Sequence, residues 1–318
     1  MLSRIAANVY WMARYLERAE NTARLVSVTS ALVLDMPGGQ EDHDRSWTHL
    51  VTIVGGEYLF SVSGESRDEK GVCRFLLSRE DNPSSLISAI EQARENLRTM
   101  RDHFPREFWE NLNTLHGFLK QNIQSGIESG RRHDFLDEVV RHCQVLVGIL
   151  IGTSSRDTTF DFFRMGQHLE RADMNTRILD LDPARLEPSA GSLPWIKLLR
   201  SVSAEQMYRR HVHPRVSGPG VLGYLLQDRR FPRSLNYCLR EVERCLATLD
   251  NNALCIPLVK RMEHMVDDAD MTFLLQNGPG NFMDVMQQEL CKLHNHIAAI
   301  YFAVPPPSTS EAAQFSCA

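Results

Sequence analysis

Apolar and small side chains recur at the start of the chain with steps that alternate between three and four residues. The run comprises Leu2, Ile5, Val9, Met12, Leu16, Ala19, Ala23 and Val26. A β-strand would need steps of two, whereas this spacing places every member on one face of a helix, as in the seam of a coiled coil. The pattern therefore predicts a long amphipathic helix.

The same period returns in eight later segments. The predicted helices are 84–102, 106–124, 133–151, 158–180, 192–210, 232–250, 253–275 and 281–302. Pro83 and Pro232 stand at plausible first-turn positions of two of them. Only 48–62, with its pair of glycines, could form a short hairpin instead. The expected fold class is all-α, a helical bundle.

An internal repeat divides the sequence into halves. Leu16-Glu17-Arg18-Ala19 recurs as Leu169-Glu170-Arg171-Ala172, an offset of 153, and weaker matches follow in the same order at offsets of 149 and 147. We therefore expect two copies of a helical unit of about 150 residues. They would span 1–152 and 153–303 and pack as one bundle about a pseudo-twofold axis, because no Gly/Ser- or Pro-rich linker separates them. The tail 304–318 is expected to be poorly ordered.

Composition excludes several classes of protein. Of 318 residues, 43% are apolar and 24% charged, which is ordinary for a soluble globular protein and unlike a collagen-like, disordered or disulfide-rich chain. The net charge of −5 argues against a protein built to hold nucleic acid. No signal-peptide pattern is present, and the most apolar window, Val145–Ile151, is far shorter than the ~18 residues that span a membrane. With no C-x-x-C pair among seven cysteines, we expect reduced thiols and a cytoplasmic location.

The repeated Glu-Arg motif is the strongest candidate for function. Its charges lie beside the apolar seam, so they should meet a partner helix rather than open water. One interpretation is that these charges form interhelical salt bridges that only fix how two helices pair. The other is an anion-binding pocket on the pseudo-axis, because the planar guanidinium grips carboxylate or phosphate with two hydrogen bonds. The candidate substrate-binding residues are Arg14, Arg18, Arg24, Arg171 and Arg177, and Glu17 and Glu170 are the candidate general bases.

A second charged cluster lies between Glu91 and Asp102. Arg98 and Arg101 are its candidate substrate-binding residues, although alternating charges on one helical face are usually solvated. Two weaker patterns do not support a site. The Gly218-x-Gly220-x-x-Gly223 run has no strand before it, which argues against a dinucleotide site. His264 with Asp267 and Asp268 has workable spacing for a metal, but one imidazole beside solvated acids is commonplace, so no metal is predicted.

The sequence resembles the bacterial alpha-E family, catalogued as a helical domain of unknown function and named for its Glu-Arg motif. The resemblance covers nearly the whole chain. It rests on Tyr10-Trp11-Met12, Arg14 to Leu25, Gly166 to Asp173, Asn82-Pro83-Ser84-Ser85, Ala93 to Asn96, Arg101-Asp102 and Phe231 to Leu235. The family's Glu-Arg pairs fall on Glu17, Arg18, Glu170 and Arg171. The Gly-Pro-Gly triplet at 218–220 departs from the pattern.

The resemblance also implies partners. Family members are companions of a circularly permuted ATP-grasp ligase, sometimes fused to it, and often neighbour transglutaminase-like proteins and a proteasome-like peptidase. It therefore implies a cytosolic component that works with an ATP-grasp amide or peptide ligase on a small peptide or amino-acid-derived anion, bound between the repeats. The alternative is a non-catalytic scaffold. ATP would belong to the ligase, and no cofactor of its own, nucleic acid or membrane is expected. The sequence leaves open whether the chain is an enzyme, which substrate it takes and whether it forms a homo-oligomer.

Overall fold

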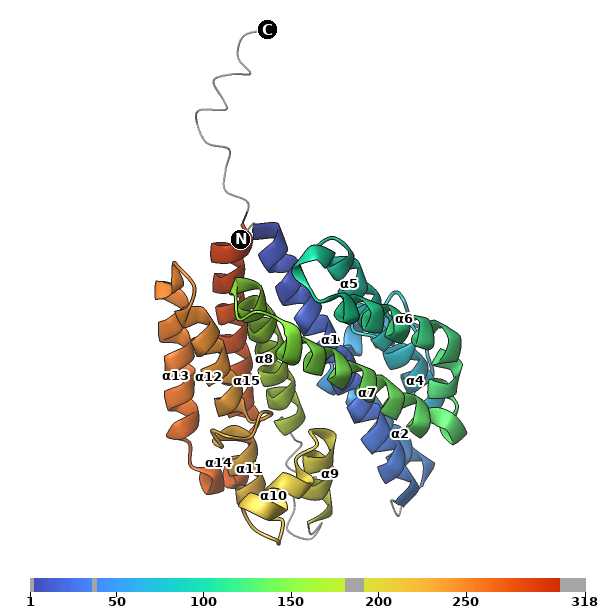
Figure 1. Cartoon of the computed structure of the whole chain (residues 1–318). Coiled ribbons are helices and arrows are strands. Elements are labelled where there is room, and N and C mark those ends of the chain that lie inside the picture. The colour runs from blue at the N-terminus through green and yellow to red at the C-terminus, as the bar shows by residue number, and fades with distance from the viewer. Residues whose placement is uncertain (1–2, 36–38, 181–191, 304–318) are drawn as a thin grey trace.

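The computed structural model of this protein describes residues 3–35, 39–180 and 192–303 (Figure 1). Within these ranges every regular element is a helix and no strand occurs, which confirms the all-α prediction. The α-helices of the first half are α1 Ser3–Asp35, α2 Gln40–Ile53, α3 Glu57–Val62, α4 Glu69–Leu77, α5 Leu86–Arg98, α6 Arg106–Ile127 and α7 Ser129–Thr153. Those of the second half are α8 Thr158–Leu179, α9 Leu193–Ser201, α10 Glu205–His211, α11 Gly218–Leu226, α12 Leu235–Ala247, α13 Cys255–Asp267, α14 Met271–Asn277 and α15 Gly280–Ile297. Short 3-10 helices η1 Arg101–His103 and η4 Asn252–Leu254 and a π-helical turn η5 Ala298–Phe302 complete the list.

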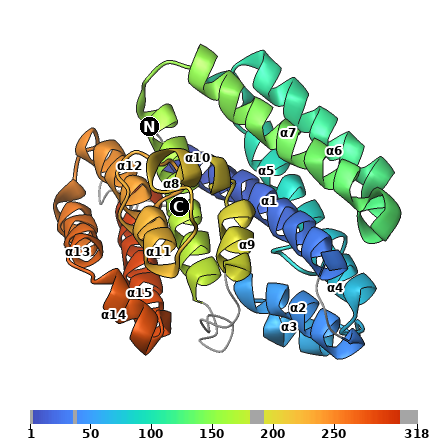
Figure 2. The same cartoon turned by 90° about the horizontal axis from the view of Figure 1, so that it is seen from below.

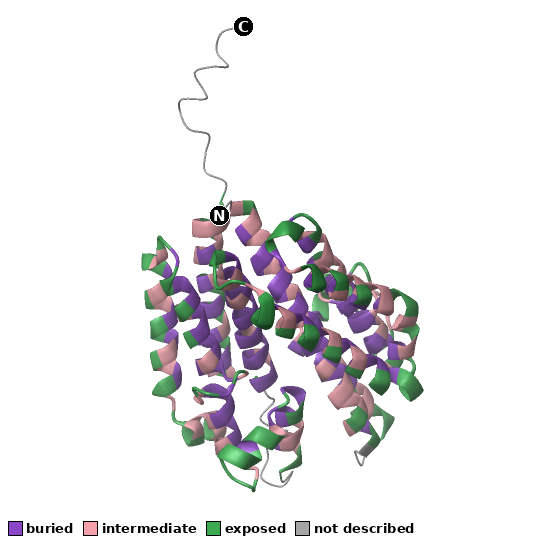
Figure 3. Ribbon diagram, viewed as in Figure 1, coloured by how far each residue is buried: buried purple, intermediate pink, exposed green. Residues whose placement is uncertain are grey.

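The centre of the bundle is the contact between α1 and α8. α1 also packs against α5 and α7, whereas α8 also packs against α12 and α15. Figures 1 and 2 show these two groups of helices on opposite sides of the α1–α8 pair. The buried apolar side chains form a single cluster that runs through both groups. In Figure 3 the buried positions accordingly follow the helix faces that look inward.

The predicted seams are buried. On α1 the members from Val9 to Val26 are all buried, and Ile5 at the fraying end is half-buried. On α8 the corresponding run from Phe162 to Leu179 is buried throughout. Leu2 lies outside the described residues. The three-and-four spacing therefore identified both central helices and the faces that pack.

Several other predictions were wrong in detail. The helix expected at 192–210 is two helices, because Ser203 adopts a left-handed φ of 54° and the amides of Ser203 and Ala204 close the end of α9 by bonding to Arg200 and Leu199. The helix expected at 253–275 also breaks, where Asp270 caps α14 by accepting from the amides of Thr272 and Phe273. The stretch 48–62, whose pattern could be mistaken for a hairpin, contains the end of α2 and the whole of α3.

Proline does not occupy the first turn of either helix for which it was expected there. Pro83 and Pro232 lie in the preceding turns, and Ser85 and Ser234 cap α5 and α12 by accepting from the amides three residues on. The N-termini of these two helices are therefore fixed by the buried serine N-caps and not by proline.

The two halves also agree in the lengths of matching helices. α4 and α11 have nine residues each, and α5 and α12 have thirteen each. Both pairs start 149 residues apart, from Glu69 to Gly218 and from Leu86 to Leu235. The expected tail 304–318 lies outside the described residues, and no helix in the described part is long and apolar enough to cross a membrane.

Candidate functional site: the Glu-Arg crossing of α1 and α8

The close approach of α1 and α8 is made possible by Gly166. A Cβ atom at this position would lie 2.3 Å from the carbonyl oxygen of Tyr10 and 3.2 Å from the Cβ of Ala13. Any side chain larger than hydrogen would therefore push the helices apart. The charged side chains that follow Gly166 along α8 are in this way brought directly against those of α1.

Glu170 of α8 is held by two arginines of α1. Arg14 Nε donates to Oε2 at 2.6 Å, while Arg18 donates from Nε to Oε1 at 2.6 Å and from Nη2 to Oε2 at 3.2 Å. Only 2% of the surface of Glu170 is exposed. Both oxygens of this buried carboxylate are therefore satisfied by charged donors, which make stronger hydrogen bonds than neutral ones.

Glu17 of α1 is held in the same way by residues of the second half. Arg171 donates from Nε to Oε1 at 2.8 Å and from Nη2 to Oε2 at 2.7 Å. Arg233, which follows α11, adds a hydrogen bond from Nη1 to Oε1 at 2.9 Å, and Gln167 Nε2 approaches Oε2 at 3.4 Å. Like Glu170, Glu17 is 2% exposed.

The two clusters mirror each other. Each Glu-Arg motif supplies its glutamate to the arginine of the other, so that Glu17 meets Arg171 and Glu170 meets Arg18. The residue three positions before each glutamate also reaches across, Arg14 on α1 and Gln167 on α8. The prediction that these charges meet a partner helix rather than open water is confirmed.

The pKa values follow from this geometry. Burial by itself raises the pKa of the Glu17 carboxyl, but Arg171 and Arg233 outweigh burial and lower the pKa to about 2. For Glu170 burial is likewise outweighed by Arg14 and Arg18, which lower its pKa to about 2. Both carboxylates are therefore ionised at neutral pH and weak as bases, so the geometry lends no support to either as a general base.

The cluster around Glu17 extends along α1. Glu20 accepts from Arg24 at 2.7 Å and from Arg233 at 2.6 Å, and Arg233 also donates to Asn21. At the corresponding place on α8, Arg177 pairs with Asp173 at 3.0 Å. Arg14, Arg18, Arg24 and Arg171, all candidates for substrate binding, thus lie in the two clusters together with Arg233 and the three glutamates. Arg14 and Arg18 face one carboxylate, Glu170, whereas Arg24, Arg171 and Arg233 face two, Glu17 and Glu20, so each cluster has one guanidinium in excess.

A polar aromatic group adjoins Arg14. His294 of α15 receives hydrogen bonds at Nδ1, from Arg14 Nη1 at 3.3 Å and from the hydroxyl of Tyr10 at 2.9 Å. Because arginine has only donors, Nδ1 must accept, and the ring proton lies on Nε2. Burial and then Arg14 lower the pKa of His294 to about 4, so the ring is neutral at neutral pH. The guanidinium of Arg14 also lies over the ring of Trp11.

The second predicted cluster lies elsewhere. Arg98 is an exposed residue of α5 that pairs with Glu95 of the same helix, and Arg101 belongs to η1 and lies over Trp109. The continuous face expected from 91 to 102 is interrupted, because α5 ends at Arg98. Their contacts within the described residues do not include the Glu-Arg motifs.

Sequence reasoning missed three contributors to the crossing, namely Arg233, Gln167 and His294. Arg233 lies within the matched segment from Phe231 to Leu235 and His294 within the predicted helix 281–302, but no local pattern connects either residue with the Glu-Arg motifs. The signal for Gln167 was present, because it stands where Arg14 stands in the other copy.

In the described part of the chain no group of three or more histidine, cysteine and acidic side chains is placed to hold a metal ion.

The groove described below lies away from this crossing. It has a volume of about 410 Å³, and its lining, as far as the structure describes the chain, includes neither Glu17 nor Glu170 nor their arginine partners. At the crossing itself, both oxygens of each buried carboxylate are held by the chain's own arginines.

Comparisons with known proteins agree with this description. Residues 1–302 match the model of the Alpha-E family, described as a predicted alpha-helical domain with a conserved ER motif. An uncharacterized protein of Mycobacterium bovis and two of Mycobacterium tuberculosis, from strains CDC 1551 and H37Rv, are each 24% identical over 311 residues. That match covers 91% of this chain but 34% of each relative, so the chain spans about a third of the length of these relatives. No solved structure matches. The chain belongs to the Alpha-E family.

Proposed function

We propose that this chain is a non-catalytic helical scaffold that works beside an ATP-grasp amide or peptide ligase in the cytoplasm, in the synthesis or modification of a small peptide. The observation that carries the scaffold part is the reciprocal closure of the two Glu-Arg motifs. Arg18 and Arg171 each direct Nε and Nη2 to both oxygens of a buried glutamate on the opposite helix, so the edge of the guanidinium that would grip a substrate carboxylate is occupied by the chain's own carboxylate.

The scaffold is built from two copies of one helical unit of about 150 residues. Three features support this duplication: the equal lengths of α4 and α11, those of α5 and α12, and the mirrored partners of Glu17 and Glu170. In this arrangement the crossing of α1 and α8 is the interface between the copies. A charged interface fixes register more strictly than an apolar one, because each guanidinium must find its carboxylate.

The ligase partner is proposed from the family resemblance. It is supported by the relatives, in which the region similar to this chain is about a third of a longer protein. A domain that supplies shape rather than chemistry is expected to occur beside a catalytic one.

Anion binding at the crossing is the second candidate function. It is favoured by the excess of guanidiniums over carboxylates and by Arg18, whose side chain is 20% exposed. In this version the site would hold a peptide carboxylate or phosphate between the copies, at the solvent edge of Arg14 and Arg18.

Two variants of the whole chain distinguish these functions when it is co-expressed with the ATP-grasp ligase. Arg18→Ala and Arg171→Ala each leave a buried glutamate with fewer partners. The scaffold predicts a large fall in melting temperature, with the ligase-coupled product lost only as the chain unfolds. Lost product at an unchanged melting temperature would instead establish the anion site.

The partnership itself is tested by co-purification with the ligase, followed by mass spectrometry of products formed from ATP and an amino-acid mixture. A stable complex and a chain-dependent product are expected. Products and yields that are the same with and without the chain, in the absence of any complex, would overturn the proposal.

A further inference from the structure

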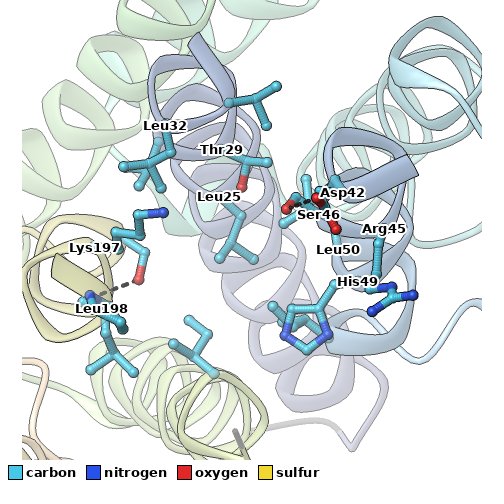
Figure 4. Close-up of a pocket in the computed structure, with 16 residues that line it drawn as sticks. Leu25, Thr29, Leu32, Asp42, Arg45, Ser46, His49, Leu50, Lys197 and Leu198 are labelled. Atoms are coloured by element: carbon cyan, nitrogen blue, oxygen red, sulfur yellow. Dashed lines mark hydrogen bonds between the residues drawn. The ribbon is translucent and has the colours of Figure 1, made fainter. Parts of the chain in front are cut away.

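A groove of about 410 Å³ lies between α1, α2, α9 and the end of α8 (Figure 4). Its apolar lining consists of Leu25, Val28, Leu32, Val33, Leu50, Ile53, Ile178, Pro194 and Leu198. Its polar lining consists of Thr29, Asp42, Arg45, Ser46, His49, Lys197 and Ser201. The volume falls within the range of about 300–1,000 Å³ that is usual for small-molecule sites.

The floor of the groove is an apolar stripe on α1. Leu25, Val28 and Leu32 follow one another at helical spacing, and Val28 and Leu32 are only half-buried. The separate apolar run of α1 from Val9 to Val26 is covered by neighbouring helices. Val28 and Leu32, by contrast, retain apolar surface from which a ligand could displace water.

Charged groups stand on both sides of this floor. Lys197 comes from α9, and Arg45 and His49 come from α2 on the opposite side, as Figure 4 shows. Arg45 is exposed and forms no ion pair with any residue in the described ranges. Among the lining residues that the structure describes, Asp42 is the single acid and Arg45 and Lys197 are the two permanent cations. The groove therefore offers positive groups that suit a carboxylate.

We propose that this groove binds a small ligand with an aliphatic chain and a terminal carboxylate. The chain would lie on Val28 and Leu32, between Leu50 and Leu198, and the carboxylate would accept hydrogen bonds from Lys197 and Arg45. Side chains of both types form charge-assisted hydrogen bonds to carboxylate. This inference uses none of the Glu-Arg residues and does not depend on the ligase partner proposed above.

The ligand class is tested on the wild-type chain by isothermal titration calorimetry with octanoate, octanol and octylamine, which share one chain length. Octanoate should bind about tenfold more tightly than octanol, the difference expected for a charge-assisted hydrogen bond. Octylamine should bind more weakly than octanoate. Equal binding of octanol, tighter binding of octylamine or no binding of octanoate would each overturn the proposal.

The location is tested by filling the groove. Thr29→Phe places a ring on the floor between Val28 and Leu32 and should abolish octanoate binding. Thr114→Phe, on the exposed surface of α6, is the matched control and should bind as the wild type does. Undiminished binding by folded Thr29→Phe would place the ligand elsewhere; the comparison of ligands on the wild type stands even if this variant unfolds.

The role of the cation is tested by Lys197→Gln, with the exposed Lys70→Gln on α4 as its control. Lys197→Gln should weaken octanoate about tenfold and leave octanol unchanged. An equal loss for both ligands would mean that the lysine acts by shaping the groove, which would contradict its assigned contact.

Two sources of the same chemistry can then be separated, a free fatty acid and the apolar carboxyl terminus of a peptide. N-acetyl-leucyl-leucine and its amide are compared with octanoate on the same chain. Tighter binding of the peptide acid than of octanoate, lost on amidation, assigns the groove to peptide termini. The reverse order assigns it to fatty acids. Binding of the amide as tightly as the acid would overturn the requirement for a carboxylate.

Discussion

Glu17 and Arg171 meet side-on across the α1–α8 crossing, with the carboxylate and guanidinium joined by two hydrogen bonds of 2.8 and 2.7 Å. The two groups are both buried, so this geometry is fixed by packing as well as by charge. Glu170 and Arg18 repeat the contact with the two helices exchanged. Two such pairs determine both the register and the rotation of α1 on α8, because sliding either helix breaks both pairs at once.

Gly166→Ala is expected to destabilise the protein by about 1–3 kcal/mol, the usual cost of overpacking. The new methyl group would lie 2.3 Å from the carbonyl oxygen of Tyr10, and relieving the clash would separate the helices that the Glu-Arg pairs hold together. The measurement is the free energy of unfolding in urea.

Gly148→Ala is the matched control for this substitution. Gly148 lies inside α7 with no atom within 4 Å of an added Cβ, so alanine should stabilise the helix by about 0.5–1 kcal/mol. Equal effects of the two substitutions would contradict the close approach of α1 and α8 at Gly166.

Glu17→Gln is expected to cost about 3–5 kcal/mol, the usual loss when one partner of a buried ion pair is removed. The amide would leave the buried Arg171 without its countercharge and would remove one of the two carboxylates that Arg233 meets. The exposed pair of Glu110 with Arg106 on α6 gives the control, since Glu110→Gln should cost no more than about 1 kcal/mol. Calorimetric melting of both variants tests the difference; a melting temperature of Glu17→Gln as high as that of Glu110→Gln would show that the crossing does not rely on charge.

The central pair of helices could be predicted from the sequence because its signal is local. A seam with steps of three and four identifies a buried face, and repetition of Leu-Glu-Arg-Ala places the same charges beside it on a second helix. From these two facts followed the expectation that the motif charges meet a partner helix, whereas the burial of Glu17 and Glu170 came only with the structure. Spacing alone could not decide whether the charges surround a cavity or close on one another, since both arrangements need the same residues.

Other features depend on contacts between distant segments, which periodicity does not report. Arg233 reaches Glu17 only because the turn before α12 packs against α1, more than two hundred residues away in the chain. The break at Ser203 depends on a left-handed residue that is not glycine, which is rare enough to escape a search for turn residues. The groove beside Lys197 exists only because α2 and α9 flank the same stretch of α1.

Stability should fall steeply with acid below about pH 4.5. The pKa values of Glu17 and Glu170 are lowered from 4.5 to about 2 in the folded protein. Above pH 4.5 both are ionised in the folded and unfolded chains, and their stabilisation is fully present. Between pH 4.5 and pH 2 the unfolded chain binds protons that the folded chain does not bind, so stability is lost as the pH falls. Urea unfolding from neutral pH down to this window measures the slope. Glu17→Gln, with one fewer of these groups, should show a shallower slope than the wild type.

A second, milder decline is expected at higher pH from His294. Its pKa is lowered from 6.5 to about 4, by burial and then by Arg14, so the folded chain keeps the ring neutral where the unfolded chain binds a proton. Stability is therefore complete above pH 6.5 and decreases as the pH falls toward 4. His294→Gln, which cannot titrate but can still accept from Tyr10 and Arg14, should make the decline in unfolding free energy shallower in this window without abolishing it, because His168 also contributes. His211→Gln, at an exposed position of α10, controls for the loss of a histidine and should leave the decline in place. If His294→Gln declines as the wild type does, the buried His168, whose pKa is also lowered by burial and nearby arginines, accounts for the effect instead.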